Sequence, residues 1–83
     1  MEKTIYTREY AVVLRLLRQA RQRARLTQVD LAKRLRITQS LFSKMERGTR
    51  RLDIVEMRNI LRVLGVSLVD FAESLEQELA KRK

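Results

Sequence analysis

Residues 26–48 read LTQVDLAKRLRITQSLFSKMERG, and this stretch decides the fold. Thr27 and Thr38, whose side chains suit the start of a helix, each precede a short run with apolar residues at helical spacing. The first run ends at a turn, and the second ends at Gly48, a residue that commonly stops a helix. The stretch predicts two short helices joined by a tight turn, with the small residue Ala32 where they approach closely.

Three further helices are indicated on either side of this motif, each with a capping residue and an apolar face. One covers about 8–24, a second begins with the capping-box-like pair Asp53 and Glu56 and ends at Gly65, and a third covers about 68–80. The caps and apolar residues are Thr7 with Tyr10, Val13, Leu14, Leu17 and Ala24, then Asp53 with Met57, Ile60, Leu61 and Leu64, then Ser67 with Leu68, Phe71, Leu75 and Leu79.

The composition fits one all-helical domain over residues 1–83. The chain has two Gly, no Pro, no Cys and no His, so neither a disulfide frame nor a Cys/His metal site is expected, and we expect no cofactor. No apolar stretch approaches the roughly 20 residues that span a bilayer, and no signal peptide is recognisable. We therefore expect a cytoplasmic protein without a membrane partner.

Positive charge is concentrated in the first part of the chain, whose net charge is +9 overall. Residues 1–52 contain fourteen Lys/Arg and four Asp/Glu, whereas residues 53–83 contain five and six. This asymmetry favours a polyanionic partner, although a solubilising surface would also explain it. An enzyme is not expected, because the chain has no His or Cys and several of its few carboxylates fit caps.

The motif at 26–48, with the step Leu64-Gly65-Val66-Ser67 that follows the next helix, resembles the Cro and phage-repressor type of helix-turn-helix, also called the XRE family. The resemblance covers roughly 60 of the 83 residues. It implies a compact five-helix, lambda-repressor-like domain with its helix-turn-helix at about 27–47. It also implies that the helix from Gln39 to Arg47 enters the major groove of double-stranded DNA.

Carried over by position, the resemblance implies base-reading and nearby contacts by Gln39, Ser40, Leu41, Ser43 and Lys44. The chemistry agrees: Gln can pair with adenine, Lys with guanine, Ser with either base type, and an exposed Leu41 with a thymine methyl group. An ordinary polar helix start is the alternative.

Phosphate contacts are expected at the beginning of the first motif helix and in the two turns. In the family a Gln at the position of Gln28 and free backbone N–H groups bind a phosphate, which the helix macrodipole favours. The Gln28 side chain could also brace Gln39, or serve only as an early-helix residue. The expected phosphate-binding residues are Thr27, Gln28, Arg36, Arg50 and Arg51, each with a solvated surface role as the alternative.

Glu46 is the one acid on an otherwise basic helix, and the resemblance implies that it points inward and pairs with Arg21 as a structural ion pair. The family usually has Gly at the positions of Arg25 and Arg36. A left-handed backbone there would cost about 1 kcal/mol per residue relative to Gly.

The expected function is a transcriptional regulator, most simply a repressor that binds a palindromic operator as a homodimer. The alternative is an antitoxin or a restriction-modification controller that acts partly through a protein partner. An RNA-binding role is less favoured, because only Tyr6 and Tyr10 could offer a stacking surface. The expected dimer interface is formed by the helix between Asp53 and Gly65 and the helix at about 68–80, through Val63, Val66, Leu75 and Leu79, unless the last two fold back on the first helix.

Overall fold

The computed structural model describes residues 7–81 and contains, within that range, five α-helices and no strand. The predicted all-α, five-helix fold is confirmed, and Tyr6 lies outside the described residues. The helices are α1 (Arg8–Arg23), α2 (Gln28–Leu35), α3 (Gln39–Arg47), α4 (Ile54–Leu64) and α5 (Leu68–Lys81). α1 ends one residue earlier than predicted, because Ala24 serves as its C-cap.

Every helix begins at the side-chain cap that the sequence predicts. Each capping oxygen accepts a hydrogen bond from the backbone N–H three residues further on, which satisfies one of the donors that a helix start leaves without a partner. The caps are Thr7, Thr27, Thr38, Asp53 and Ser67. At α2 and α4 the caps form complete capping boxes, with Asp30 and Glu56 as the returning side chains. Local sequence therefore sets where the helices start.

Two arginines adopt the left-handed backbone that usually requires glycine. Arg25 and Arg36 have φ values of 62° and 61°, close to the 87° and 78° of Gly48 and Gly65. Arg36 is the C-cap of α2, and its N–H donates to the carbonyl oxygens of Ala32 and Lys33. Both turns thus keep the geometry of a glycine turn, at some cost in strain at each arginine.

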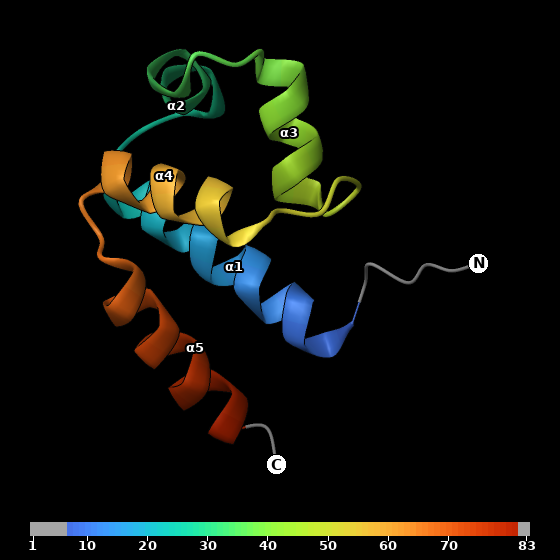
Figure 1. Cartoon of the computed structure of the whole chain (residues 1–83), viewed down its shortest axis with the longest axis vertical. Coiled ribbons are helices and arrows are strands. Elements are labelled where there is room, and N and C mark those ends of the chain that lie inside the picture. The colour runs from blue at the N-terminus through green and yellow to red at the C-terminus, as the bar shows by residue number, and fades with distance from the viewer. Residues whose placement is uncertain (1–6, 82–83) are drawn as a thin grey trace.

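The helix-turn-helix lies at one end of the molecule. In Figure 1, α3 runs steeply past α2, which is seen almost end-on, and both lie above the crossing of α1 and α4. α1 contacts α3, α4 and α5, whereas α2 contacts α3 and α4. α5 packs along α1 and α4 on the side away from α2 and α3. The arrangement leaves one side of α3 without a neighbouring helix.

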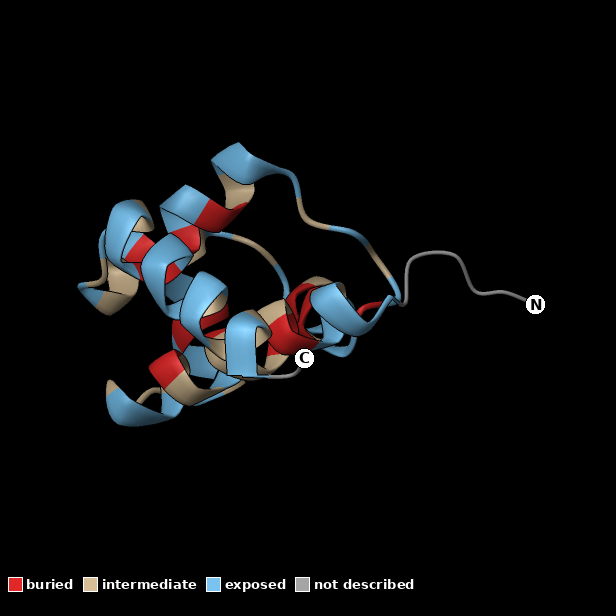
Figure 2. Ribbon diagram, turned by 90° about the horizontal axis from the view of Figure 1, so that it is seen from below, coloured by how far each residue is buried: buried red, intermediate tan, exposed pale blue. Residues whose placement is uncertain are grey.

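The core lies where the helices face one another, as the buried segments in Figure 2 show. Its fully buried apolar side chains are Leu17, Leu31, Phe42, Ile60 and Leu61. The predicted face of α1 is only partly right: Leu14 and Leu17 are buried, but so are Val12 and Ala20, whereas Tyr10, Val13 and Ala24 are half-buried. α1 contacts three helices, so its buried surface is wider than a single helical stripe.

The apolar side chains expected to form a dimer interface are not the most exposed ones. Val63 and Val66 are half-buried against the core, and Leu75 lines a groove with Tyr10 and Val13 of α1. Leu79 is also half-buried. Leu75 thus faces α1 within the same chain, and a dimer interface through these four residues stays a prediction. The large exposed apolar side chains are instead Val29, Ile54, Val55 and Val69.

The backbone at Gly65 provides a test of how strongly the turns constrain the fold. Gly65→Ala should lower the free energy of unfolding by about 1 kcal/mol, because a residue with a Cβ is strained at its φ of 78°. The added Cβ would meet no atom within 4 Å, so the backbone alone should account for the loss. Arg36→Gly is the matched change and should raise stability by up to about 1 kcal/mol. Urea unfolding should give opposite signs for the two variants; the same sign for both would contradict this account.

Candidate nucleic-acid interface

One side of α3 presents a polar surface. Gln39, Ser40 and Lys44 are exposed, while Phe42 and Met45 on the opposite side of the helix are buried in the core. Burial of the two apolar side chains fixes the rotation of the helix about its axis. The exposed side of α3 can therefore enter a groove without disturbing the core.

Two residues of the expected reading set are less available than the others. Leu41, expected to be exposed, is half-buried, packs against the core and lines a small hollow with Ile37 and Ile60. That expectation was wrong, because the side of α3 that carries Leu41 faces α4. Ser43 is half-buried, and its Oγ accepts a hydrogen bond of 2.9 Å from Arg47 Nη1. Neither residue is as open to a ligand as Gln39.

A buried carboxylate joins α3 to α1 and α2. Glu46 is 2% exposed, and its Oε2 accepts from Arg21 Nε at 2.8 Å. Its Oε1 accepts from Arg21 Nη2 at 3.2 Å and from Gln28 Nε2 at 2.7 Å. Arg21 also donates from Nη1 to the carbonyl oxygen of Leu26 at 2.9 Å. Arg21 and Glu46 are thus in direct contact, and their fork geometry ties together the ends of three helices.

The side chain of Gln28 contacts Glu46 rather than Gln39. The amide of Gln28 was expected to contact a phosphate or to brace Gln39. Its hydrogen bond to Glu46 leaves the second amide hydrogen and the carbonyl oxygen for other partners.

The start of α2 already carries a negative charge, the carboxylate of Asp30, which accepts a hydrogen bond from the Thr27 N–H at 3.0 Å. This backbone hydrogen bond, followed by the one with the Thr27 hydroxyl, lowers the pKa of Asp30. A phosphate at this end would have to approach beside a carboxylate.

The loop after α3 is held by side-chain contacts. Arg50 donates from Nη2 to Glu56 Oε2 at 2.8 Å and from Nη1 to Glu56 Oε1 at 3.2 Å. These hydrogen bonds raise the pKa of Arg50 and are the main cause that lowers the pKa of Glu56. The guanidinium of Arg51 lies over the ring of Tyr10, 4.9 Å from its centroid. Both arginines therefore have defined positions in the loop that follows α3.

The surface around the motif is strongly basic. Residues 26–52 contain seven Lys/Arg and only two acids, of which Glu46 is buried with Arg21 and Asp30 is engaged in its capping box. The exposed basic residues on this part of the chain are Lys33, Arg34, Arg36, Lys44, Arg47 and Arg51. Such a distribution attracts a polyanion to the side of the molecule that carries α2 and α3.

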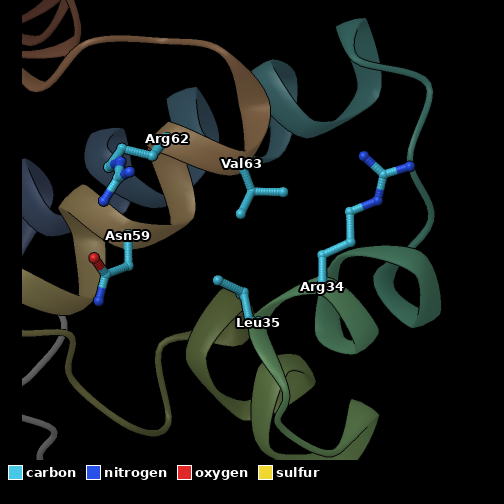
Figure 3. Close-up of a pocket in the computed structure, with 5 residues that line it drawn as sticks. All are labelled: Arg34, Leu35, Asn59, Arg62 and Val63. Carbon is cyan, nitrogen blue, oxygen red and sulfur yellow. The ribbon is translucent and has the colours of Figure 1, made fainter.

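The hollow between α2 and α4 does not form a ligand site. It has a volume of about 400 Å³ and is lined by Arg34, Leu35, Asn59, Arg62 and Val63. In Figure 3 the two apolar side chains face each other, while the guanidinium groups of Arg34 and Arg62 point in different directions. Their charges do not converge on one position, as binding of a small anion would require.

The described residues contain no group of three or more His, Cys, Asp or Glu that could hold a metal ion. None of the five helices is both long enough and apolar enough to cross a membrane.

The geometry is that of a helix-turn-helix protein that binds DNA. Residues 13–73 match the family model described as a helix-turn-helix domain, and the chain belongs to this family. The matched part begins within α1 and ends within α5, so it includes the whole motif and α4. No curated protein and no solved structure matches the chain. The protein is therefore a helix-turn-helix DNA-binding domain.

Some contacts at this surface had no signal in the sequence. The bond from Gln28 to Glu46, the pairing of Arg50 with Glu56 and the position of Arg51 over Tyr10 all join residues at spacings that no helical or turn rule predicts. Only the capping-box role of Glu56 could be recognised in advance, and that role does not indicate Arg50 as a second partner.

Removing the partner of Glu46 tests the importance of the buried pair. Arg21→Met takes away two of the three side-chain hydrogen bonds that the carboxylate accepts, and should lower the free energy of unfolding by about 3 to 5 kcal/mol. The double variant Arg21→Met/Glu46→Leu should recover much of that loss, because no unpaired charge stays buried.

Arg15→Met is the matched control for this change. It breaks the exposed ion pair with Glu78, whose atoms are 3.0 Å apart, and should have a far smaller effect. Equal losses in denaturant unfolding for Arg21→Met and Arg15→Met would contradict the structural role of the buried pair.

Proposed function

We propose that the protein is a sequence-specific regulator of transcription of the Cro and phage-repressor (XRE) type. The observation that carries this proposal is the exposed polar side of α3, on which Gln39, Ser40 and Lys44 are open to solvent while Phe42 and Met45 anchor the helix. Gln39 suits adenine and Lys44 suits guanine in the major groove. Bound at an operator, such a protein represses by occupying the promoter.

Contacts with the DNA backbone would orient α3 in the groove. We assign this role to Arg50 and Arg51 after α3, to Arg36 in the motif turn, and to the start of α2 at Thr27 and Gln28. Exposure of Arg36 and Arg51, together with the defined position of Arg50, supports the assignment. The Asp30 carboxylate at the start of α2 makes that end the weakest of these contacts.

We also propose that residues 1–83 form a single domain, which acts in the cytoplasm without a cofactor and without enzymatic activity. We propose that the protein binds DNA as a homodimer, because one recognition helix reads too few base pairs to select one site in a genome. Two copies on a palindrome would place their recognition helices about 34 Å apart.

The surface that best suits a second copy combines the start of α4 with α5. Ile54 and Val69 are 68% and 70% exposed. Ile54 borders a groove of about 290 Å³ between α1, α4 and α5. Val69 lines a second, more open hollow along α5. Ala72 lines both, so the two hollows are continuous. Leu75 lines the same groove as Ile54, and it stays in the proposed interface with Val63, Val66 and Leu79.

An antitoxin or a restriction-modification controller is the alternative, because the same surface could bind a different protein. Its exposed apolar residues lie beside Glu73 and Glu76, which line the hollow along α5. A basic partner would find complementary charge there.

Base reading is tested by selecting binding sites from random DNA and then measuring affinity for the selected and a random duplex. Gln39→Ala and Lys44→Ala should each cost about 1 to 3 kcal/mol on the selected site and much less on the random one. Ser74→Ala is the control and should bind like the parent protein, because Ser74 is exposed on α5 and lines neither hollow. Equal losses on both duplexes would reassign Gln39 and Lys44 to the backbone, and failure to select any sequence would overturn the proposal.

Self-association is tested by placing a charge on the proposed interface. Val69→Glu and Ile54→Glu should shift the protein from dimer to monomer in sedimentation at micromolar concentration, and should weaken binding to a palindromic site more than to a half-site. Ser74→Glu is the control, since Ser74 is exposed on α5 but lines neither hollow. Unchanged dimers of both interface variants would contradict this interface, and one protein per duplex on a symmetric site would contradict the dimer.

A further inference from the structure

The loop between α3 and α4 is fixed from two sides by residues outside it. Tyr10, in the first turn of α1, contacts Arg51 and Leu52, and Glu56, in the first turn of α4, contacts Arg50. We propose that Tyr10 and Glu56 are positioning residues, which hold Arg50 and Arg51 ready for the DNA backbone. This inference rests on the proposed function and adds two residues to it.

Glu56 orients the guanidinium of Arg50 and leaves part of it available. The carboxylate accepts from Nη1 and Nη2, which uses two of the five N–H donors that a guanidinium carries. The Arg50 side chain stays 41% exposed, so other donors can reach a phosphate while the pair is intact. Glu56 Oε1 also accepts from the Asp53 N–H at 3.0 Å, which anchors the carboxylate itself to the start of α4.

Tyr10 performs the corresponding task for the second half of the loop. Its hydroxyl oxygen accepts from the Leu52 N–H at 3.0 Å, and its ring lies under the guanidinium of Arg51. The first contact fixes the backbone after Arg51, and the second fixes the direction of the side chain. Tyr10, which lies 42 positions before Leu52, thus defines where the charge of Arg51 points.

The loop is also hydrogen-bonded to the end of α3. Tyr10 and Glu56 therefore fix Arg50 and Arg51 relative to the recognition helix. The N–H groups of Thr49 and Arg50 donate to the carbonyl oxygen of Lys44 at 3.0 and 3.3 Å, and the Thr49 hydroxyl donates to the same oxygen at 3.1 Å. Ordering long side chains before binding reduces the entropy lost on binding. The two residues should therefore raise affinity without touching DNA.

A plain electrostatic role for Glu56 predicts the opposite sign. Its negative charge lies beside a phosphate-binding loop and would by itself weaken the attraction for DNA. If that were its only effect, removing the charge should tighten binding. If it positions Arg50, removing the charge should weaken binding although the protein becomes more basic.

The decisive variant is Glu56→Gln, measured with the duplex that the parent protein selects. We expect binding to weaken about three- to tenfold, the range for one side chain that must be ordered on binding. The matched control is Glu78→Gln, which removes the same charge from an ion pair of similar exposure between α5 and α1. The control should change affinity less than twofold. Tighter binding by Glu56→Gln would overturn the inference.

A double variant shows whether Glu56 acts through Arg50. In the background of Arg50→Ala, Glu56→Gln should cause no further loss, and the log-log salt slope of Arg50→Ala itself should be shallower by about 0.9. A loss of the same size in both backgrounds would contradict positioning.

Tyr10→Phe tests the second positioning residue, because it keeps the ring but loses the hydrogen bond to Leu52. This variant should also weaken binding, about threefold or more. Parent-like affinity would remove Tyr10 from the proposal.

Folding of each variant is checked by circular dichroism. Should Glu56→Gln not fold, Arg50→Lys makes the same test, because it keeps the charge but lacks the two-pronged geometry of the pair. Weaker binding supports positioning, and unchanged binding contradicts it. Failure of the parent protein to select any DNA sequence would instead contradict the proposed function, so the two failures are distinguishable.

Discussion

A carboxylate can be buried in a protein only if charged and polar partners replace the water that it loses. Glu46 meets this condition through two hydrogen bonds from Arg21 and one from Gln28. Because the three residues come from α3, α1 and α2, their contacts fix how the two motif helices meet the rest of the domain. Arg21 extends the same network to the backbone at Leu26, in the link between α1 and α2. The position of α3 depends on this charged cluster together with the burial of Phe42 and Met45.

The remaining features follow from that position. With Glu46 held inward and Phe42 buried, the first turn of α3 can present only its polar side to solvent. Hydrogen bonds from Thr49 and Arg50 to the carbonyl oxygen of Lys44 hold the following loop against the end of α3. The arginines of this loop therefore have fixed positions relative to the exposed polar side chains of α3. α5 lies at the other side of the domain, along α1 and α4, and carries its own exposed apolar surface around Val69. The basic residues around α2 and α3 are thus separated from the mainly acidic α5.

Local rules predicted the helices well, because a cap such as Thr27 acts within three residues and needs no knowledge of the fold. The left-handed turn at Arg36 was considered only as one possibility, because an Arg stands where the family usually has Gly. Long-range features were not predictable. Leu41 lies on the side of α3 that happens to face α4, and the pairing of Tyr10 with the Leu52 N–H depends on where the start of α1 lies relative to a loop far along the chain. Helical periodicity identifies apolar and polar faces, but it does not say which distant element covers each.

The central claim, that this domain binds DNA through α3 and the loop after it, is tested most directly by NMR. Backbone amide signals of the labelled protein would be followed while the selected duplex is added. The account predicts large shifts at Gln39, Ser40 and Lys44, at the Arg50–Arg51 loop and at the start of α2. It also predicts small shifts over 73–77 on the outer side of α5. Shifts concentrated on α5, with those of Gln39 and Lys44 unchanged, would contradict it.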